Sequence, residues 1–277
     1  MNRYVVVGGG RAGQARMRSL AAFSELEGVL LPARSSTFKE DFQRQLADPT
    51  VLAVVVCTAN QTHYEMAYAA LDASKHVLVE FPLTATAGEA ETLFELARRR
   101  QRVLHVEFIG LMTPSHQAYR EMSQARWCHA HVRMAGGYYR WVREEAEAGR
   151  WGSLLNGRLQ ALHHLFGNLS LTRATLGRQA DGYELSVELT TETGIEISIV
   201  DTRQVDCPRV RDLTIYDRDG RVISPKINRK PMALFQADLE VFRAKIAGHE
   251  IGWSLPSESD VIEVIRLSHL ISEQCAS

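Results

Sequence analysis

Three glycines near the N-terminus are spaced so that they could bind phosphate groups. Residues 5–13 read V-V-V-G-G-G-R-A-G, which places Gly8, Gly10 and Gly13 in a G-x-G-x-x-G pattern between an expected strand and an expected helix. The first glycine would allow a tight turn, the second a close approach of backbone to a pyrophosphate, and the third close packing of helix on strand. The alternative is a merely flexible glycine turn. The backbone amides that would meet the phosphates lie at the helix N-terminus and include those of Arg11 and Ala12.

The segment after the second expected strand bears on the choice of dinucleotide. An acidic residue there would bind the ribose hydroxyls of NAD and repel a 2′-phosphate. Residues 30–36 read L-L-P-A-R-S-S and contain no acid. Arg34 could instead pair with a phosphate, and Ser35 and Ser36 could donate hydrogen bonds to it. This pattern favours NADP(H) as the cofactor, unless Arg34 is an ordinary surface residue.

The order of apolar and amphipathic stretches predicts how these residues are positioned. Short runs rich in Val, Leu and Ala alternate with helical patterns, which is typical of a parallel sheet covered on both faces. We therefore predict an α/β protein whose N-terminal Rossmann domain, a doubly wound parallel sheet, spans residues 1–113. Its strands are expected at 3–7, 28–33, 51–57, 76–80 and 102–108, and its helices at 12–22, 38–46, 62–73 and 86–100.

The pattern changes after residue 113. Successive strands that follow helices predict an α+β domain over residues 114–277, built on a large open, mainly antiparallel sheet. Helices are expected there at 115–123, 141–149, 154–166, 232–247 and 258–274, and strands at 129–135, 183–190, 194–201 and 212–217.

Several residues follow the expected strands of the first domain, at the edge where open α/β sheets bind ligands. The loop after the third strand would lie along the nicotinamide ribose, and the loop after the fourth would border the nicotinamide ring. His63 has an alternative role as a helix N-terminal residue capped by Thr62. The expected cofactor contacts in these loops are Thr58, Ala59, Asn60, His63, Glu80, Phe81 and Pro82.

His105 and Glu107 alternate on the fifth expected strand, so they share a face near its carboxyl end. Both are candidates for catalysis. The alternative for His105 is a buried, hydrogen-bonded structural residue. Other histidine pairs lack an accompanying ligand cluster, so we expect no metal site.

Composition excludes several classes of protein. The 277 residues carry 32 basic and 33 acidic side chains, which does not indicate a nucleic-acid partner or a polybasic membrane surface. No apolar run approaches the ~18 residues that a membrane span needs. Four scattered cysteines are typical of reduced thiols, so a cytoplasmic location is expected.

Three further segments carry a resemblance to a known family. They read V-V-C-T-A-N-Q-T-H from Val55, K-H-V-L-V-E-F-P-L from Lys75 and V-L-H-V-E from Val103. Together with the glycine motif they resemble the Gfo/Idh/MocA oxidoreductases, in which a Rossmann domain precedes an α+β domain with a large open sheet. Within that superfamily the biliverdin reductases are most similar, through these segments and through R-L-Q-A-L-H-H-L-F-G from Arg158.

The chain departs from the family pattern at the positions of the usual bases. Sugar-acting members carry a lysine where this chain has Phe81, and Gly157 and Gln160 stand where their D-x-G-x-H-x-x-D segment has its histidine and second aspartate. Biliverdin reductases carry a tyrosine at the position of Phe81, so the ring is kept and the hydroxyl is lost. Gly110 likewise replaces the second glutamate of their H-x-E-H-x-E-L segment.

The resemblance implies an NADPH-dependent reductase that transfers hydride to the central methine of biliverdin or a similar linear tetrapyrrole. Arg158 would face this pigment and assist its protonation, unless it forms a surface ion pair with a glutamate at 144–147. Alternatives for the chain are another reductase or dehydrogenase of the superfamily, acting on a sugar derivative or an imine, and a non-catalytic NADP-binding regulator. Residues 138–143, Y-Y-R-W-V-R, could stack on a flat ligand or form a subunit interface, so a homo-oligomer through the C-terminal sheet stays open.

Overall fold

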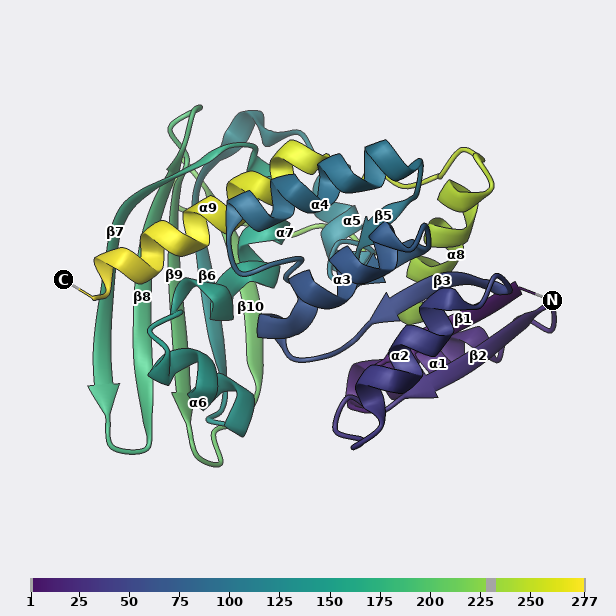
Figure 1. The fold of residues 1–277 in the computed structure, drawn as a ribbon. Helices are drawn as coiled ribbons and strands as arrows, with labels where there is room; N and C mark the ends of the chain where they lie inside the picture. Colours follow the sequence, from purple (N-terminus) through teal and green to yellow (C-terminus); the bar gives the residue numbers. More distant parts are fainter. Residues whose placement is uncertain (1, 228–232, 277) are drawn as a thin grey trace. The chain divides into compact units, whose positions relative to one another are not determined.

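The computed structural model describes residues 2–227 and 233–276. It divides into two compact units, one of Met1–Thr113 with Pro231–Ile262 and one of Pro114–Lys230 with Glu263–Ser277. The α/β class and both kinds of sheet that the sequence predicts are present (Figure 1). Within the described residues, no helix combines the length and the apolar character that crossing a bilayer requires.

The first unit is built on a parallel sheet of five strands in the order β2-β1-β3-β4-β5. The chain order reverses between β1 and β3, and ligands of doubly wound sheets bind at such a switch point, beyond the carboxyl ends of the strands. The elements are β1 (Asn2–Val7), α1 (Arg11–Leu20), β2 (Leu26–Leu31), α2 (Phe38–Ala47), β3 (Val51–Val56), α3 (His63–Asp72), β4 (His76–Val79), α4 (Ala87–Arg100) and β5 (Leu104–Val106).

Local sequence explains these elements. The central strands β1, β3 and β4 are rich in Val and Leu, and most of their residues are buried, as expected of strands covered on both faces. Helix α4 begins at a capping box in which Thr86 and Glu89 each accept from the other's backbone N–H. It ends at Gln101, whose left-handed backbone terminates the helix.

Helix α8 (Leu234–Ile246) covers part of the same sheet. Leu239 and Phe242 pack with Tyr4, Val55 and Leu78 in one buried cluster. The sequence predicts a single domain over residues 114–277. The structure instead assigns residues 231–262 to the first unit. Apolar contacts and buried charges attach α8 to the Rossmann unit, although it follows the second sheet in the chain.

The second unit carries a six-stranded sheet in the order β11-β10-β6-β9-β8-β7. Among the strands of the described residues only β6 and β9 pair in parallel in this sheet, so it is mainly antiparallel as predicted. Its elements are α5 (Pro114–Arg120), β6 (Trp127–Gly137), α6 (Arg140–Glu147), α7 (Asn156–Phe166), β7 (Leu169–Gln179), β8 (Gly182–Thr191), β9 (Glu196–Gln204), β10 (Val210–Asp217) and β11 (Val222–Ile223), while helix α9 (Glu258–Gln274) runs from the first unit into this one.

Strand β7 is absent from the sequence-based prediction. It lies at the edge of the sheet (Figure 1). Only Ala174 among its residues is buried. Its alternation of apolar and polar residues is broken by a register shift between Leu171 and Arg173, which weakens the pattern by which strands are recognised.

Candidate active site

The glycine turn after β1 has the geometry that its spacing predicts. Gly8 has a φ of +112°, and a Cβ there would lie 2.3 Å from the carbonyl oxygen of Cys57. A Cβ on Gly13 would lie 1.9 Å from the carbonyl oxygen of Gly8. Gly10 is different, because no atom lies within 4 Å of the position of its Cβ. The first and third glycines are thus required by the fold, whereas the second leaves space for a ligand to approach the backbone.

Helix α1 presents its N-terminus beside this turn. Gly10 is the N-cap residue, and no side chain caps the helix. The first turn, which includes Arg11 and Ala12, contains no acidic residue. Free N–H groups and the positive end of the helix dipole make such a terminus suitable for binding a phosphate.

The segment after β2 lies next to the glycine turn, since a Cβ added to Gly9 would have Pro32 as its nearest neighbour. Residues 32–37 are exposed. Ser35 shares a hydrogen bond with Thr37, whereas Arg34 has no ion pair within the described part of the chain. The guanidinium of Arg34 is therefore available to an anionic ligand.

The loop after β3 is held by His63. Its Nδ1 lies 2.7 Å from the carbonyl oxygen of Pro82 and its Nε2 lies 3.2 Å from that of Thr58. The ring is buried, so His63 ties together the two loops that were expected to border the cofactor and does not itself face solvent. The hydroxyl of Thr62 bonds back to Thr58 and Ala59 and does not cap the helix, so the capping role is not observed.

Three strands end side by side beyond the switch point. Each extends its ladder by one residue: the amides of Cys57, Glu80 and Glu107 donate to Val7, Val56 and Val79 at 2.8, 2.9 and 2.9 Å. Cys57, Glu80 and Glu107 therefore form a row along the carboxyl edge of the sheet. Ala59 is exposed, and Asn60, Glu80 and Phe81 are half-buried along this edge.

A buried arginine, Arg16, forms ion pairs with two carboxylates, one of them from this row. The Nε of Arg16 lies 2.6 Å from Oε1 of Glu80, and its Nη1 lies 2.7 Å from Oδ2 of Asp238. Burial lowers the pKa of Arg16, but Glu80 and Asp238 more than compensate, so this pKa is raised overall. For Asp238 burial opposes ionisation, but His105 and Arg16 outweigh it and keep its pKa below the usual range.

His105 is fully buried among these groups. Its Nε2 lies 3.0 Å from Oδ1 of Asp238, and its Nδ1 lies 3.2 Å from Nζ of Lys245. Because a lysine ammonium can only donate, Nδ1 accepts and Nε2 carries the hydrogen that is donated to Asp238. Burial lowers the pKa of His105. The structure thus gives His105 the structural role, and the expectation that it is catalytic is corrected, since no part of its side chain is exposed.

Glu107 shares the inner face of β5 with His105, as their alternation predicts. Its Oε1 accepts a hydrogen bond of 2.5 Å from the amide of Ile109. Burial, followed by the charges of Glu80 and Asp238, raises the pKa of Glu107 to about 8. A carboxyl group with this pKa is protonated in a large fraction of molecules at neutral pH.

Arg158 belongs to the second unit, where it is half-buried on α7. Burial lowers its pKa, which the charge of Asp212 partly offsets. The proposed ion pair with a glutamate at 144–147 is not observed among the described residues, because Glu144 pairs with Arg140 and Glu145 with Arg150. On the same helix Gln160 is buried, and both its amide atoms lack a hydrogen bond in the described structure.

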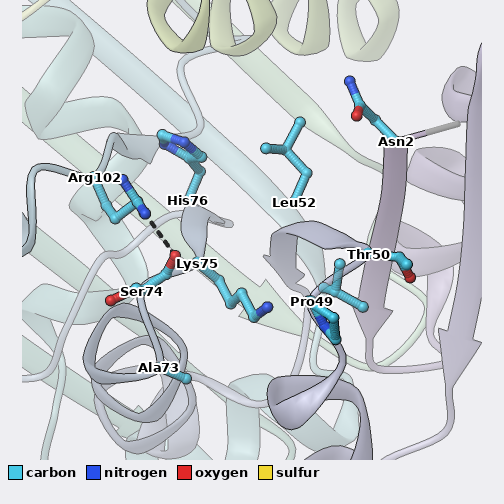
Figure 2. Close-up of a pocket in the computed structure, with 10 residues that line it drawn as sticks. Asn2, Pro49, Thr50, Leu52, Ala73, Ser74, Lys75, His76 and Arg102 are labelled. Carbon is cyan, nitrogen blue, oxygen red and sulfur yellow. Dashed lines mark hydrogen bonds between the residues drawn. The ribbon is translucent and has the colours of Figure 1, made fainter.

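A polar pocket lies elsewhere in the first unit (Figure 2). It is lined by residues at the amino ends of β3 and β4, among them Thr50, Lys75 and His76. Arg102 donates to the carbonyl oxygen of Ser74 at 2.6 Å (Figure 2). Lys75 donates to the carbonyl oxygen of Asp48 at 2.7 Å. The glycine turn and the row of Cys57, Glu80 and Glu107 lie at the opposite, carboxyl edge, so this pocket is separate from the expected cofactor site.

Two members of the charge cluster could not be found from the sequence. Asp238 and Lys245 lie on α8, which the sequence pattern assigns to the other domain. The sequence offers one indication that Arg16 is important, namely its position one turn after Gly13 on a helix that packs against the sheet. Across residues 2–227 and 233–276 no three His, Cys, Asp or Glu residues are grouped so that they could hold a metal ion.

Comparison with known proteins agrees with this geometry. Residues 2–108 match the model of the oxidoreductase family with an NAD-binding Rossmann fold, Gfo/Idh/MocA. Biliverdin reductase A of Mus musculus is 28% identical over 289 residues, which cover 98% of this chain and 95% of the mouse protein. The human biliverdin reductase A is also 28% identical, over 99% of this chain and 96% of its own length.

Solved structures show the same fold. A biliverdin reductase from Synechocystis, crystallised with biliverdin and NADP⁺, superimposes with a TM-score of 0.79 at 19% identity and covers 99% of each chain. A putative myo-inositol dehydrogenase from Sinorhizobium meliloti also reaches 0.79, at 17% identity, over 100% of this chain and 98% of its own. With its glycine turn, its row of strand-end residues and these relatives, the chain is an NAD(P)H-dependent oxidoreductase whose residues 2–108 match the NAD-binding Rossmann fold of the Gfo/Idh/MocA model.

Proposed function

We propose that the protein is an NADPH-dependent reductase that transfers hydride to the central methine of biliverdin or of a similar linear tetrapyrrole. The observation that carries this proposal is the extent of the likeness to biliverdin reductase A, which spans nearly the whole of both chains. The likeness to the NADP⁺-dependent scyllo-inositol 2-dehydrogenase of Bacillus subtilis covers only 35% of this chain.

The residues at position 81 and on α7 support a substrate other than a sugar. Oxidation of a sugar hydroxyl needs a base within hydrogen-bond reach. Phe81 provides no such base, and the Gln160 amide cannot accept a proton at neutral pH. A reductase that acts on a conjugated pigment does not need a base there, and an aromatic side chain forms an apolar wall beside a nicotinamide.

The residues that would hold NADPH are those of the carboxyl edge. The turn of Gly8, Gly10 and Gly13 and the amides of Arg11 and Ala12 would bind the pyrophosphate. When bound, NADPH supplies the hydride. Contacts to the 2′-phosphate would come from Arg34, Ser35 and Ser36, and contacts along the ribose and nicotinamide from Thr58, Ala59, Asn60, Glu80, Phe81 and Pro82, with His63 holding the two loops together.

Arg158 would act on the pigment. Its guanidinium is half-buried and keeps only Asp212 as a compensating charge in the described structure. A positive charge of this kind can stabilise charge that develops on the tetrapyrrole while the pyrrole nitrogen gains a proton. Since arginine does not deprotonate in proteins, the proton itself must come from another group.

Absorbance spectroscopy of the purified protein tests the proposal. With NADPH and biliverdin, we expect the visible absorption of the pigment to disappear as it is reduced to bilirubin, and the rate with NADH to be lower. The similar folds of sugar dehydrogenases make sugar-dependent reduction of NADP⁺ the first alternative outcome. Sugar-dependent reduction of NADP⁺ would overturn the proposal. NADPH binding without reduction of biliverdin would also overturn it, and would indicate a regulator.

A further inference from the structure

Three carboxyl groups of the first unit surround a single guanidinium. Glu80 directly follows β4, Glu107 directly follows β5, and Asp238 approaches from α8. Arg16 forms ion pairs with Glu80 and Asp238 at 2.6 and 2.7 Å. This cluster contains more acid than Arg16 can neutralise.

Glu107 is the carboxyl group that lacks a countercharge. Its one hydrogen bond within the described residues comes from the amide of Ile109, and no cation of that part of the chain lies within ion-pair distance of it. A carboxylate that is withdrawn from water without a positive partner is costly, and protonation removes that cost. The crowding of Glu80 and Asp238 acts in the same direction.

Glu107 is not completely enclosed. It is half-buried, whereas His105 on the same face is completely buried. Glu107 lies next to Glu80, whose loop continues into Phe81 and Pro82, at the edge where the nicotinamide is expected. A carboxyl group at this edge can transfer a proton to a bound substrate and can regain one from water when no substrate is bound.

We propose that Glu107 is the carboxylic acid that donates the proton to the substrate during reduction, and that the neighbouring carboxylates of Glu80 and Asp238 help to keep it protonated. This inference rests on the proposed function. The O–H bond of Glu107 breaks, its proton forms an N–H bond on the pyrrole nitrogen, and the methine carbon accepts the hydride that NADPH supplies. Glu107 is left as a carboxylate and regains a proton from water, so charge and electrons balance.

The groups around Glu107 explain why it holds the proton. Burial and the negative charges of Glu80 and Asp238 raise its pKa to about 8, while Arg16 and the amide of Ile109 oppose this shift. His105 faces Asp238 with its N–H, and Lys245 contacts His105, so neither hydrogen bonds to Glu107. Cys57 completes the row from β3, and burial raises the pKa of its thiol far above neutrality.

Among the described side chains along this edge, no other is suited to the task. Phe81 has no hydroxyl group. The imidazole of His105 has no exposed surface and both its nitrogens are engaged. Burial raises the pKa of Glu80 as well, but its Oε1 is held at 2.6 Å by Nε of Arg16, whereas Glu107 has no such ion pair among the described residues.

The substitution Glu107→Gln tests the proposal, because glutamine keeps the acceptor for the amide of Ile109 and lacks the acidic proton. We expect turnover of biliverdin to fall by roughly 10²–10⁴, a typical contribution of a general acid. Affinity for NADPH should be unchanged. Wild-type turnover should decline as the pH rises through about 8, and the decline should be absent from the variant. The matched control is Glu95→Gln on the exposed side of α4, which should behave as the wild type.

Infrared spectroscopy supplies a measurement that does not depend on activity. Wild-type protein should show the C=O band of a protonated carboxyl group at pH 6 that disappears by pH 10 and is missing from Glu107→Gln. Circular dichroism checks that the variant is folded, and Glu107→Asp, a shorter acid, should retain part of the turnover. If the band is present but biliverdin is not reduced, the proposed function fails alone. Absence of the band, or full turnover by Glu107→Gln, overturns the role of Glu107.

Discussion

The guanidinium of Arg16 lies 2.7 Å from the carboxylate of Asp238, and neither side chain has any exposed surface. Arg16 is on α1, directly after the glycine turn, and Asp238 is on α8, far along the chain. This ion pair joins the helix that presents its N-terminus to the cofactor site with the helix that covers the strand-end acids.

Removing Arg16 should destabilise the protein strongly. Arg16→Met leaves Asp238 and Glu80 without their buried partner, and breaking such a pair costs about 3–5 kcal/mol. Urea unfolding measures the loss. The control is Arg140→Met, which breaks an exposed pair with Glu144 and should cost less than about 1 kcal/mol. Equal losses in the two variants would show that burial does not make the Arg16 pair special.

The glycines of the turn should separate stability from binding. Gly13→Ala brings a methyl group within 1.9 Å of the Gly8 carbonyl and should cost at least ~1–3 kcal/mol. Gly10→Ala meets no atom within 4 Å and has a φ of −73°, so its stability should match the wild type. Its affinity for NADPH should nevertheless fall, because the methyl group occupies the approach to the backbone. Thermal melts and fluorescence titration with NADPH distinguish the two effects, and unchanged affinity in Gly10→Ala would place the pyrophosphate elsewhere.

Much of the first unit could be predicted because its signals are local. The glycine spacing, the buried Val-rich strands and the alternation of His105 with Glu107 are all contained in short segments. The partners of His105 could not be predicted. Asp238 and Lys245 sit on an amphipathic helix whose sequence does not reveal which sheet it covers, so the buried role of His105 becomes visible only in the folded chain.

The second unit was less predictable for a related reason. Strand β7 buries almost nothing, and a register shift between Leu171 and Arg173 interrupts its alternation of apolar and polar residues, so its pairing with β8 is what identifies it as a strand. Arg158 was recognised by resemblance, but its charged neighbour Asp212 comes from β10, which no local pattern connects with α7.

Arg34→Ala should weaken NADPH binding selectively. Arg34 lies in an exposed segment and forms no ion pair in the described structure, so its guanidinium can pair with the 2′-phosphate. Loss of a charge-assisted hydrogen bond costs about 1.5–3 kcal/mol, or roughly 10–100-fold in affinity. NADH binding should not change. Arg44→Ala, another exposed arginine nearby, is the control. Equal weakening of both cofactors would show that Arg34 does not recognise the phosphate.

The stability of the wild type and of Glu107→Gln should diverge with pH. The pKa of Glu107 is about 8 in the folded protein and about 4.3 in the unfolded chain. Between these values the folded state holds a proton that the unfolded state has released, so the wild type loses stability as the pH rises. Glutamine does not titrate. The free energy of unfolding of the variant should therefore rise relative to that of the wild type between about pH 4.3 and 8. Above pH 8 the difference between the two proteins should stay constant. Urea midpoints at several pH values measure this, and a constant difference would mean that Glu107 ionises normally.

Arg158→Ala should lower turnover without affecting the binding of NADPH. Its half-buried guanidinium would stabilise charge that is larger in the transition state than in the bound pigment, an effect of roughly 10²–10⁴ in rate. Arg158→Lys should recover only part of the activity, since lysine keeps the charge and loses the planar guanidinium.

Steady-state rates with biliverdin measure turnover, and fluorescence titrations with NADPH measure cofactor affinity. Arg126→Ala, which removes an exposed arginine of the same unit from its pair with Asp217, should keep wild-type turnover. If Arg158→Ala loses stability and cofactor binding together, Arg158 is structural, and if it turns over biliverdin at the wild-type rate, it has no part in the reaction.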